Sequence, residues 1–302
     1  MPKVLITGGN GFLGNNIIPE LLDAGFDITN LSLHPIENPA VQNIVFDAFK
    51  DEPADLLQNE DFDFVIHLAA YASPKLASDF DKTIELNVAL TEKLLKLAQN
   101  LHSLKTFLFF SSATTYSDDA ERPLKEDSAQ KAHEGDNYAY SKIEAEKVCK
   151  EYMRLGLPVK ILRLTNCFGP HQNWRDRPNL IPQIMKEAIL EKKITILNGN
   201  HVRDFLYSKD LARIIRLSLE DTRNFDILNI ATGELSTVGE IAEFVSKQMK
   251  VPVYDQKKEI DRVNNLSMDT SKFKKLFPGF MFTKLEYALK ETLNYYISEI
   301  SA

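Results

Sequence analysis

The strongest constraint on the fold is a regular alternation between short runs of β-branched and aromatic residues and longer runs of helical period. Seven apolar runs have the length of strands, at residues 3–7, 27–33, 43–46, 64–68, 106–110, 159–164 and 227–230. Six runs of helical period lie between or after them, at residues 13–24, 79–100, 138–155, 180–191, 209–219 and 237–249. This alternation is typical of βαβ units that stack into a parallel sheet. We therefore expect an α/β fold with a doubly wound parallel sheet.

The texture of the chain changes after residue 165. Residues 166–177 are rich in Gly, Pro, His, Asn and Trp, and such irregular segments often present binding residues. The apolar run at 227–230 resembles the core strands again, so we expect the chain to return to the sheet there. The sequence therefore predicts a first domain of residues 1–165 plus about 203–232, and a smaller, discontinuous second domain of about 166–202 plus 233–302.

Charge and cysteine content argue against several classes of protein. The 36 basic residues are outnumbered by 43 acidic ones, and no run of Lys and Arg is long enough to follow a nucleic acid. No apolar stretch has the length of a signal peptide or a membrane span. The two cysteines, Cys149 and Cys167, form no C-x-x-C pair, and the histidines have no metal-binding spacing. We expect a cytoplasmic protein with no nucleic acid, membrane or metal partner.

A glycine-rich turn follows the first predicted strand and opens the first predicted helix. Gly9, Gly11 and Gly14 satisfy the pattern G-x-G-x-x-G, and Gly8 precedes them. In this context the backbone N–H groups and the helix dipole can hold a pyrophosphate, which predicts a dinucleotide site. Ser32 occupies the place at the end of the second strand where an acidic residue selects NAD. The choice between NAD and NADP therefore stays open.

The pattern Tyr-x-x-x-Lys places a phenol and an ammonium one turn apart on a helix, where the cation favours the phenolate. It occurs three times, but Pro74 interrupts the first, which begins at Tyr71, and the third, from Tyr254, follows extended chain. Only Tyr138 and Lys142 open a long amphipathic run. We expect Lys142 to lower the pKa of Tyr138 from about 10 toward neutrality, which would make Tyr138 a general base.

Hydroxyl side chains gather at the end of the fifth predicted strand, in the sequence FFSSATTY at residues 109–116. Ligands of doubly wound sheets bind beyond the carboxyl ends of the strands. A serine there can orient the substrate oxygen from which the tyrosine removes a proton. The alternative is a turn rich in Ser and Thr.

The chain resembles the NAD-dependent epimerase/dehydratase family, the extended short-chain dehydrogenases/reductases, which includes the UDP-glucose 4-epimerases. The resemblance runs in order along nearly the whole chain. It rests on residues 7–14 (TGGNGFLG), 63–70 (DFVIHLAA), 87–88 (NV), 111–116 (SSATTY), 138–142 (YAYSK), 162–170 (LRLTNCFGP), 179–182 (NLIP), 203–205 (RDF), 229–233 (NIATG) and 269–272 (DTSK). Several motifs in register are far more specific than a single one.

The resemblance implies a Rossmann-type domain for NAD or NADP and a smaller α/β domain for a nucleotide sugar. By position, Ser112, Tyr138 and Lys142 correspond to the catalytic residues. The implied cofactor contacts are Gly8, Gly11, Phe12, Leu13, Gly14, Ser32, Asp47, Ala48, Leu68, Ala69, Ala70, Asn87, Tyr138 and Lys142. The implied substrate contacts are Ser112, Thr114, Asn166, Asn179 and Arg203. Alternatives are a solvated carboxylate at Asp47, a structural ion pair at Arg203, and loop capping by Asn166 and Asn179.

The resemblance leaves three functions open. Ser112 is followed by Ala113 and Thr114, without the Asp-Glu pair of the family's dehydratases, so we do not expect dehydration. A C4 epimerase, which keeps its cofactor, is the first expectation, and a 4-keto-sugar reductase that consumes NAD(P)H is the alternative that Ser32 favours. A redox-inactive dinucleotide sensor is a third. The resemblance also suggests a homodimer through the helices at 79–100 and 138–155.

Overall fold

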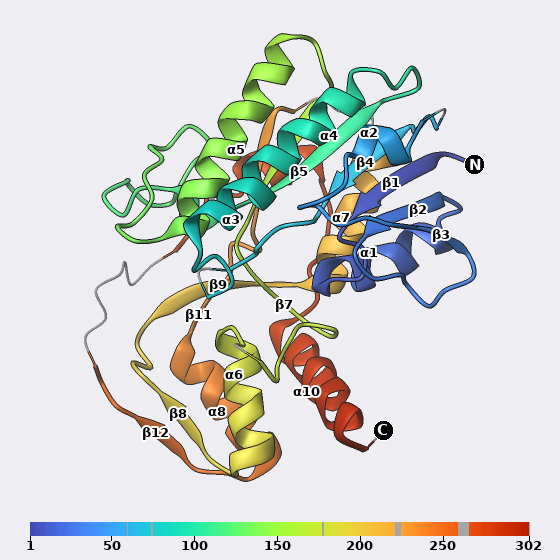
Figure 1. Ribbon diagram of the computed structural model, residues 1–302. Coiled ribbons are helices and arrows are strands. Elements are labelled where there is room, and N and C mark those ends of the chain that lie inside the picture. The colour runs from blue at the N-terminus through green and yellow to red at the C-terminus, as the bar shows by residue number, and fades with distance from the viewer. Residues whose placement is uncertain (59, 74, 177, 221–224, 259–265, 302) are drawn as a thin grey trace. The chain divides into compact units, whose positions relative to one another are not determined.

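The computed structural model describes residues 1–58, 60–73, 75–176, 178–220, 225–258 and 266–301 (Figure 1). The chain divides into two compact units. The first comprises Met1–Ala120, Glu126–Leu164 and Ala212–Leu228, and the second comprises Glu121–Lys125, Thr165–Leu211 and Asn229–Ala302. The domain ranges expected from the sequence stay predictions, and each unit is described by itself.

A seven-stranded parallel sheet of Rossmann type forms the centre of the first unit. Its strands are β1 (Lys3–Thr7), β2 (Asp27–Ser32), β3 (Val41–Val45), β4 (Phe64–His67), β5 (Thr106–Ser112), β6 (Val159–Leu164) and β10 (Ile227–Ile230). They lie in the order β10-β6-β5-β4-β1-β2-β3, so the doubly wound sheet predicted from the sequence is confirmed. Thr7 pairs with Leu31 on β2 and with His67 on β4. The strand order reverses at β1, where ligands of such sheets bind.

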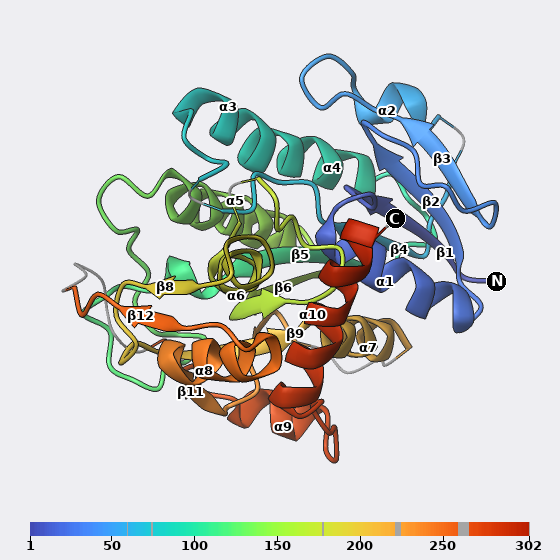
Figure 2. The ribbon, with the colours of Figure 1, turned by 90° about the horizontal axis from the view of Figure 1, so that it is seen from below.

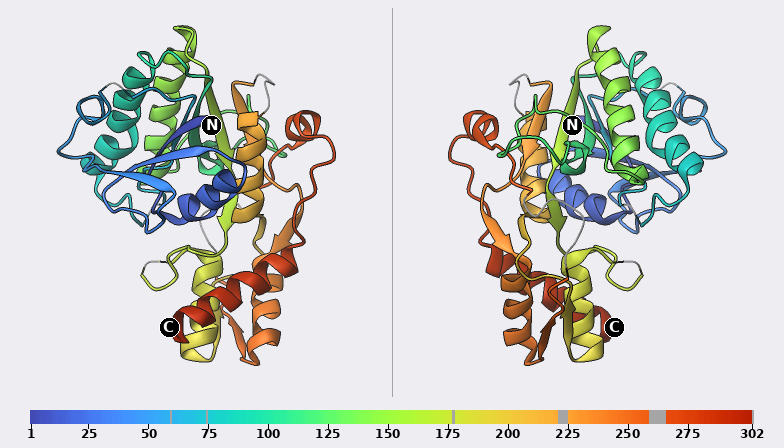
Figure 3. Two further views of the ribbon diagram at one scale, coloured as in Figure 1. Left: turned by 90° about the vertical axis from the view of Figure 1, so that its right-hand side faces the viewer. Right: turned by 90° about the vertical axis from the view of Figure 1, so that its left-hand side faces the viewer.

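Helices cover both faces of this sheet, and strands such as β1 and β5 are buried on both sides along nearly their whole length. The helices are α1 (Phe12–Asp23), α2 (Pro53–Leu56), α3 (Phe80–Ile84), α4 (Leu90–Ala98), α5 (Asn137–Arg154) and α7 (Ser208–Glu220). A π-helical turn, η1 (Glu85–Ala89), joins α3 to α4 in one continuous rod (Figure 2). α4 and α5 pack on one face of the sheet, and α1 and α7 on the other (Figure 3).

The core beneath α4 and α5 shows why these elements pair. Leu5 on β1, Phe107 and Phe109 on β5, and Ile161 on β6 are fully buried against Leu94 and its neighbours on α4. Burial of a side chain of this size contributes about 1.5–3 kcal/mol. α5 begins after Asp136, whose Oδ1 accepts a hydrogen bond of 3.0 Å from the N–H of Ala139.

The second unit is built from shorter elements. β7 (Asn166–Phe168), β9 (Val202–Tyr207) and β11 (Leu235–Thr237) form one sheet, and β8 (Ile194–Ile196) pairs with β12 (Val253–Asp255). Its helices are α6 (Leu180–Lys186), extended by the π-helical turn η3 (Glu187–Glu191), α8 (Val238–Met249), α9 (Ser271–Leu276) and α10 (Leu285–Ser301). α6 and α8 match the sequence prediction, whereas the short strands, α9 and α10 were not predicted. In the described part of the chain no helix has the length and apolarity needed to cross a bilayer.

Candidate active site

The glycine-rich turn between β1 and α1 can be built only from glycine at two positions. Gly8 has φ +69°, and a Cβ there would lie 2.8 Å from the Ala69 nitrogen. A Cβ on Gly14 would lie 2.1 Å from the Gly9 carbonyl oxygen. Gly11 is the N-cap of α1, and its side-chain-free backbone precedes Phe12 and Leu13 in the first turn. The turn therefore presents bare backbone at a helix N-terminus, which fits a pyrophosphate.

The end of β2 is held by side-chain hydrogen bonds rather than by charge. The Ser32 hydroxyl lies 2.9 Å from the His34 carbonyl oxygen and 3.1 Å from Asn30 Oδ1. Asn30 Oδ1 also accepts a bond of 3.2 Å from the Gly9 N–H, and so joins β2 to the glycine turn. Asn30 was not among the residues predicted from the sequence, although a polar residue at a buried strand position is a signal for such a role. A cofactor contact at Ser32 stays a prediction.

Asp47 and Ala48 follow β3, as expected from the sequence. Asp47 Oδ2 lies 2.8 Å from Lys50 Nζ, and Oδ1 accepts a bond of 3.0 Å from the Phe49 N–H. The hydrogen bond from Lys50 and that from Phe49 hold the pKa of Asp47 below its usual value. The carboxylate is therefore ionised and engaged in a local turn. The predicted cofactor contacts of Asp47 and Ala48 stay predictions.

The segment after β4 is fastened by Asn87. Leu68 and Ala69 bond through their N–H groups to the Thr7 carbonyl and hydroxyl, at 3.1 and 3.3 Å. Asn87 Oδ1 accepts a hydrogen bond of 2.8 Å from the Tyr71 N–H, and Nδ2 donates one of 3.2 Å to the Tyr71 carbonyl. Ala70 lies between these two anchors. Asn87 belongs to the π-helical turn η1, a distortion common at functional sites.

The Asn87 amide also reaches α5. Its Nδ2 lies 2.9 Å from the Ser141 hydroxyl on α5, directly before Lys142. Both amide N–H groups are therefore used within the protein. Asn87 positions the segment after β4 against α5, while the predicted cofactor contact stays a prediction.

A buried histidine, which the sequence analysis did not assign, connects β1, β4 and α4. His67 Nδ1 lies 2.7 Å from the Thr7 hydroxyl, and Nε2 lies 3.0 Å from the Thr91 hydroxyl. The Thr91 hydroxyl donates its own hydrogen to the Asn87 carbonyl, at 2.8 Å, so it accepts from His67. His67 is thus neutral, with its proton on Nε2. Burial lowers its pKa to about 3, and the charge of Lys142 acts in the same direction.

Ser112 and Tyr138 lie together as the sequence predicts. Ser112 ends β5, and its hydroxyl oxygen accepts bonds from the N–H and hydroxyl of Thr114, at 3.2 and 2.9 Å. Tyr138 lies in the first turn of α5 and is hydrogen-bonded to Ser112, which lowers its pKa. Burial has the larger effect and raises the pKa of Tyr138 to about 12. The expectation that Lys142 brings this pKa toward neutrality is therefore wrong for the protein without ligand, because desolvation dominates.

Lys142 is buried without an acceptor for its ammonium. Only 4% of the residue is exposed, and Nζ lies 4.8 Å from the centroid of the Phe109 ring. Across the described ranges, no oxygen accepts a hydrogen bond from this group. Burial lowers the pKa of Lys142 to about 8, against the charges of Cys149 and Glu146, which raise it. A buried ammonium with unused N–H groups fits a hydroxyl-bearing ligand such as a ribose.

The other two Tyr-x-x-x-Lys matches do not form helical pairs. Tyr71 lies in irregular chain and Lys75 in a turn, while Tyr254 belongs to β12. Pro74 lies outside the described residues. The prediction that only Tyr138 and Lys142 share a helix face is confirmed.

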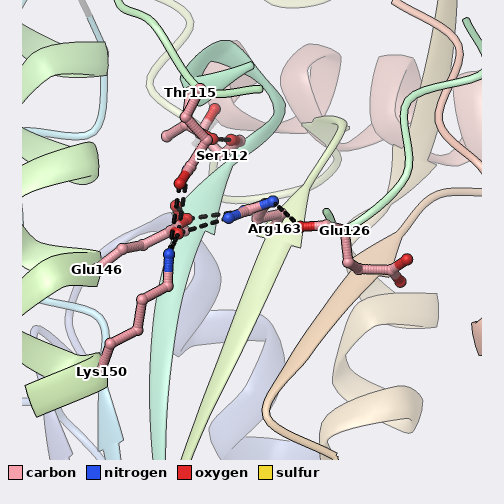
Figure 4. Close-up of polar contacts among 8 residues, drawn as sticks. Ser112, Thr115, Glu126, Glu146, Lys150 and Arg163 are labelled. Atoms are coloured by element: carbon pink, nitrogen blue, oxygen red, sulfur yellow. Dashed lines mark hydrogen bonds and ion pairs between the residues drawn. The ribbon is translucent and has the colours of Figure 1, made fainter. Parts of the chain in front are cut away.

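A buried ion pair completes this part of the first unit. Glu146 on α5 and Arg163 on β6 are each 1% exposed, and the Arg163 Nη2 lies 2.6 Å from the Glu146 Oε2 (Figure 4). Neither residue was predicted from the sequence to belong to the site. The available signals were a carboxylate four residues after Lys142 and a charge within an apolar strand.

Of the predicted substrate residues, Ser112 and Thr114 lie in the first unit, and Asn166, Asn179 and Arg203 lie in the second. Asn166 begins β7 and donates from Nδ2 to the Asp204 carbonyl at 3.0 Å. Arg203 lies on the neighbouring strand β9 and donates from Nη1 to the Val202 carbonyl at 2.9 Å. Asn179 is the exposed N-cap of α6 but makes no side-chain capping bond. Their roles toward a substrate stay predictions. Within the described ranges, no group of three or more His, Cys, Asp and Glu side chains could hold a metal ion.

Proteins of known sequence or structure are similar to this chain in sequence and in fold. The sequence profile of the NAD dependent epimerase/dehydratase family matches residues 4–231. A UDP-N-acetyl-alpha-D-glucosaminuronate decarboxylase of Bacillus cytotoxicus is 26% identical over 97% of each chain. A putative UDP-glucose 4-epimerase of Methanocaldococcus jannaschii is 26% identical over 90% of this chain and 92% of its own. The solved UDP-N-acetylglucosamine 4-epimerase of Methanobrevibacter ruminantium superposes with a TM-score of 0.87, at 26% identity and 99% coverage of each chain. These relatives act on nucleotide sugars, but at equal identity they catalyse different reactions.

Proposed function

The chain belongs to the NAD dependent epimerase/dehydratase family, and from that premise we propose that it is a nucleotide-sugar 4-epimerase. Such an enzyme inverts the configuration at C4 of a sugar carried on a nucleoside diphosphate. One observation carries the proposal. The hydrogen-bonded hydroxyls of Ser112 and Tyr138 occur in the same unit as a glycine turn for a pyrophosphate and a buried ammonium without an acceptor.

The first unit fits NAD, with NADP as the alternative. The backbone of the turn at Gly8, Gly11 and Gly14 would hold the pyrophosphate, and Lys142 would bind the hydroxyls of the nicotinamide ribose. When bound, NAD would supply a hydride acceptor and donor for C4 of the sugar and a positive charge in the site. The buried position of Lys142 strengthens its bonds to such a ligand.

Tyr138 and Ser112 would handle the proton. Tyr138 Oη takes the proton of the C4 hydroxyl as C4 is oxidised and returns it when C4 is reduced. Ser112 Oγ orients the same hydroxyl, since it already contacts Tyr138. Burial holds the pKa of Tyr138 at about 12 without ligands, so a cation must act on the phenol for it to ionise near neutral pH. The positive charge of a bound oxidised cofactor would supply it.

The sequence around Ser112 favours epimerisation over dehydration. Elimination of water needs an additional acid and base, and the next residues, Ala113 and Thr114, carry neither. Thr114 instead donates to Ser112. A 4-keto-sugar reductase is the second candidate, because Ser32 at the end of β2 is not acidic and its hydroxyl lies against the His34 carbonyl. An enzyme that consumes NAD(P)H does not need to retain its cofactor.

Two measurements separate these functions. Denaturation of purified protein followed by analysis of released nucleotide should give stoichiometric NAD for the epimerase and an empty site for the reductase. Incubation with UDP-, GDP- and dTDP-sugars should then give the C4 epimer without net change in NADH absorbance. Net oxidation of NADH with a 4-keto sugar, or release of carbon dioxide from a UDP-uronic acid, would contradict epimerisation.

Variants of α5 test the assignment of the general base. Tyr138→Phe removes only the hydroxyl and should abolish turnover while NADH binding, followed by fluorescence, is preserved. Tyr140→Phe is the matched control, because Tyr140 lies on the same helix with an exposed side chain. Undiminished turnover by Tyr138→Phe would refute the role of Tyr138.

We also propose contacts from the second unit to the substrate. Arg203 suits a diphosphate because its guanidinium pairs two oxygens at once. Asn166 and Asn179 offer amide groups to the sugar nucleotide. Arg203→Lys keeps the positive charge but removes the planar guanidinium that can pair two oxygens. It should raise KM for the substrate with little change in kcat. An unchanged KM would show that Arg203 does not bind the substrate.

A homodimer through α3, α4 and α5 completes the proposal. Phe80 and Tyr140 are about half exposed, and their rings lie 5.8 Å apart, so they form an apolar patch across α3 and α5. Light scattering after size exclusion should give twice the chain mass for wild type, and Phe80→Glu should shift the protein toward the monomer. A monomeric wild type would contradict the dimer.

A further inference from the structure

The Glu146 carboxylate is saturated by five donors in the protein interior. Oε1 accepts from the Ser111 hydroxyl at 2.6 Å and from Arg163 Nε at 2.8 Å. Oε2 accepts from Arg163 Nη2 at 2.6 Å, from Gln130 Nε2 at 3.0 Å and from Lys150 Nζ at 3.3 Å. Figure 4 shows Arg163 facing Glu146 with two parallel bonds. A bidentate pair of this kind fixes direction as well as distance.

Two of the donor residues, Ser111 on β5 and Lys150 on α5, lie on the elements that carry the proposed catalytic groups. Ser111 directly precedes Ser112 at the end of β5. Tyr138, Lys142 and Glu146 follow one another on α5 at intervals of four residues. The three residues therefore share one helix face. One carboxylate therefore joins the strand that ends in Ser112 to the helix that carries Tyr138.

Arg163 also contacts the chain that follows Ser112. Its Nη1 donates 2.9 Å to the Glu126 carbonyl, and its guanidinium lies 4.7 Å from the centroid of the Tyr116 ring. Gln130, which bonds to Glu146, forms a β-bridge with Tyr116. Arg163 and Gln130 both contact Tyr116, and they therefore hold the turn that follows Ser112.

We propose that Glu146 is a positioning residue, which keeps the hydroxyl of Ser112 aligned with that of Tyr138 by tying β5 and β6 to α5. The proposal rests on the function proposed above. Displacement of a catalytic group by about 1 Å can cost about 100-fold in rate. A link that passes through Ser111, the residue next to Ser112, controls that displacement directly.

Glu146 also acts on Lys142 through its charge. The titratable groups beside Lys142 are Glu146 and Cys149 on its own helix, which raise its pKa, and His67 on β4, which is neutral, while the Phe109 ring of β5 faces the ammonium. Glu146 raises the pKa of Lys142, while burial lowers it. Loss of the carboxylate leaves the positive charges of Arg163 and Lys150 nearby and should lower this pKa further. Activity that needs the ammonium should then decline at a lower pH.

The test uses the full-length protein with NAD and UDP-glucose, or whichever screened nucleotide sugar the wild type converts. Ser111→Ala cuts the link to β5 and should lower kcat about tenfold, with KM within about twofold. Glu146→Gln should lower kcat about 100-fold and move the alkaline decline of kcat to lower pH. Glu146→Asp, which keeps the charge, should restore part of kcat and the wild-type pH profile.

A control and the contrary outcomes make the test decisive. Glu151→Gln removes a carboxylate from an exposed part of the same helix and should leave kcat unchanged. Wild-type kcat and pH profile in a folded Glu146→Gln protein would overturn the proposal. Should Glu146→Gln fail to fold, Ser111→Ala decides, and an unchanged kcat there refutes the link.

Failure of the proposed function is distinguishable. If the wild type converts none of the sugars, crystal structures of wild type and Ser111→Ala measure the separation of Ser112 Oγ and Tyr138 Oη without any assay. A separation that grows by about 1 Å supports positioning. An unchanged separation contradicts it.

Discussion

Helix α5 is held in the first unit by two buried polar groups of opposite character. The neutral network consists of Thr7, His67, Thr91, Asn87 and Ser141, joined by hydrogen bonds without formal charge. The charged cluster consists of Glu146, Arg163, Ser111, Gln130 and Lys150. Both fix the face that carries Tyr138 and Lys142, one toward β1 and β4 and the other toward β5 and β6.

The difference lies in what happens when one partner is lost. A neutral hydrogen bond contributes a net free energy of about 0.5–1.5 kcal/mol, and a buried neutral group left without its partner costs about 1–3 kcal/mol. A buried charge that loses its partner costs about 3–5 kcal/mol, although the intact pair adds little net stability. The charged cluster is therefore the more fragile of the two, and the neutral network the more tolerant.

The largest effect is expected for Arg163→Met. The substitution keeps most of the side-chain volume but leaves Glu146 buried without its bidentate partner, so the free energy of unfolding should fall by about 3–5 kcal/mol. Urea unfolding at pH 7 measures it. The double variant Glu146→Met with Arg163→Met removes both charges and should recover most of the loss. A loss below about 1 kcal/mol in the single variant would contradict the asymmetry.

The second prediction separates the two groups by pH. Burial holds the pKa of His67 at about 3, against 6.5 for an ordinary histidine, so the unfolded chain binds a proton that the folded chain does not. Stability from neutral His67 is thus fully present above pH 6.5 and falls as the pH drops toward 3. Between pH 6.5 and 5 the loss should be about 1.5 kcal/mol.

Unfolding of wild type and His67→Asn at both pH values measures this contribution, since the variant cannot titrate there. Exposed His102→Asn is the control and should keep the wild-type slope. Glu146 behaves differently, because its pKa is held below the usual 4.5 despite the burial that opposes this, chiefly by Arg163. The stability from its charge is lost only below about pH 4.5. If the free energy of unfolding changed equally with pH in wild type and in His67→Asn above pH 5, the predicted contribution of neutral His67 to stability would be refuted.

The third prediction probes one hydroxyl of the neutral network. Thr91→Val is nearly isosteric but removes the oxygen that accepts from His67 Nε2 and donates to the Asn87 carbonyl. The free energy of unfolding should fall by about 1–2 kcal/mol, the cost of a buried polar group without its partner. Urea unfolding checks it, and a loss as large as that of Arg163→Met would erase the distinction between the two groups.

The sequence could predict the scaffold of this site but not the groups that hold it. The strands of the large sheet, the glycine turn and the helical pair Tyr138 and Lys142 follow from signals within a few residues. The contacts of His67 with Thr7 and of Glu146 with Arg163 join residues 60 and 17 positions apart, which no local pattern reports. The three-residue strands of the second unit are too short to show a period.

The pKa of Tyr138 is beyond local sequence patterns for a related reason. A one-turn spacing predicts the neighbouring ammonium but not the desolvation that raises the pKa to about 12. Burial is a property of the packed chain, since α5 must be placed on the sheet before Tyr138 loses its water. The sign of such a shift therefore depends on tertiary contacts.

The smallest effect is expected where charge is present without burial. Glu151 and Arg154 form an ion pair of 2.8 Å on the same helix as Glu146, but their side chains are 60% and 74% exposed. Water solvates each charge whether or not its partner is present, so Glu151→Gln should change the free energy of unfolding by less than about 0.5 kcal/mol. Urea unfolding in low and high salt measures it beside Arg163→Met. A loss of several kcal/mol at Glu151 would show that charge on α5, rather than burial of charge, makes the cluster around Glu146 fragile.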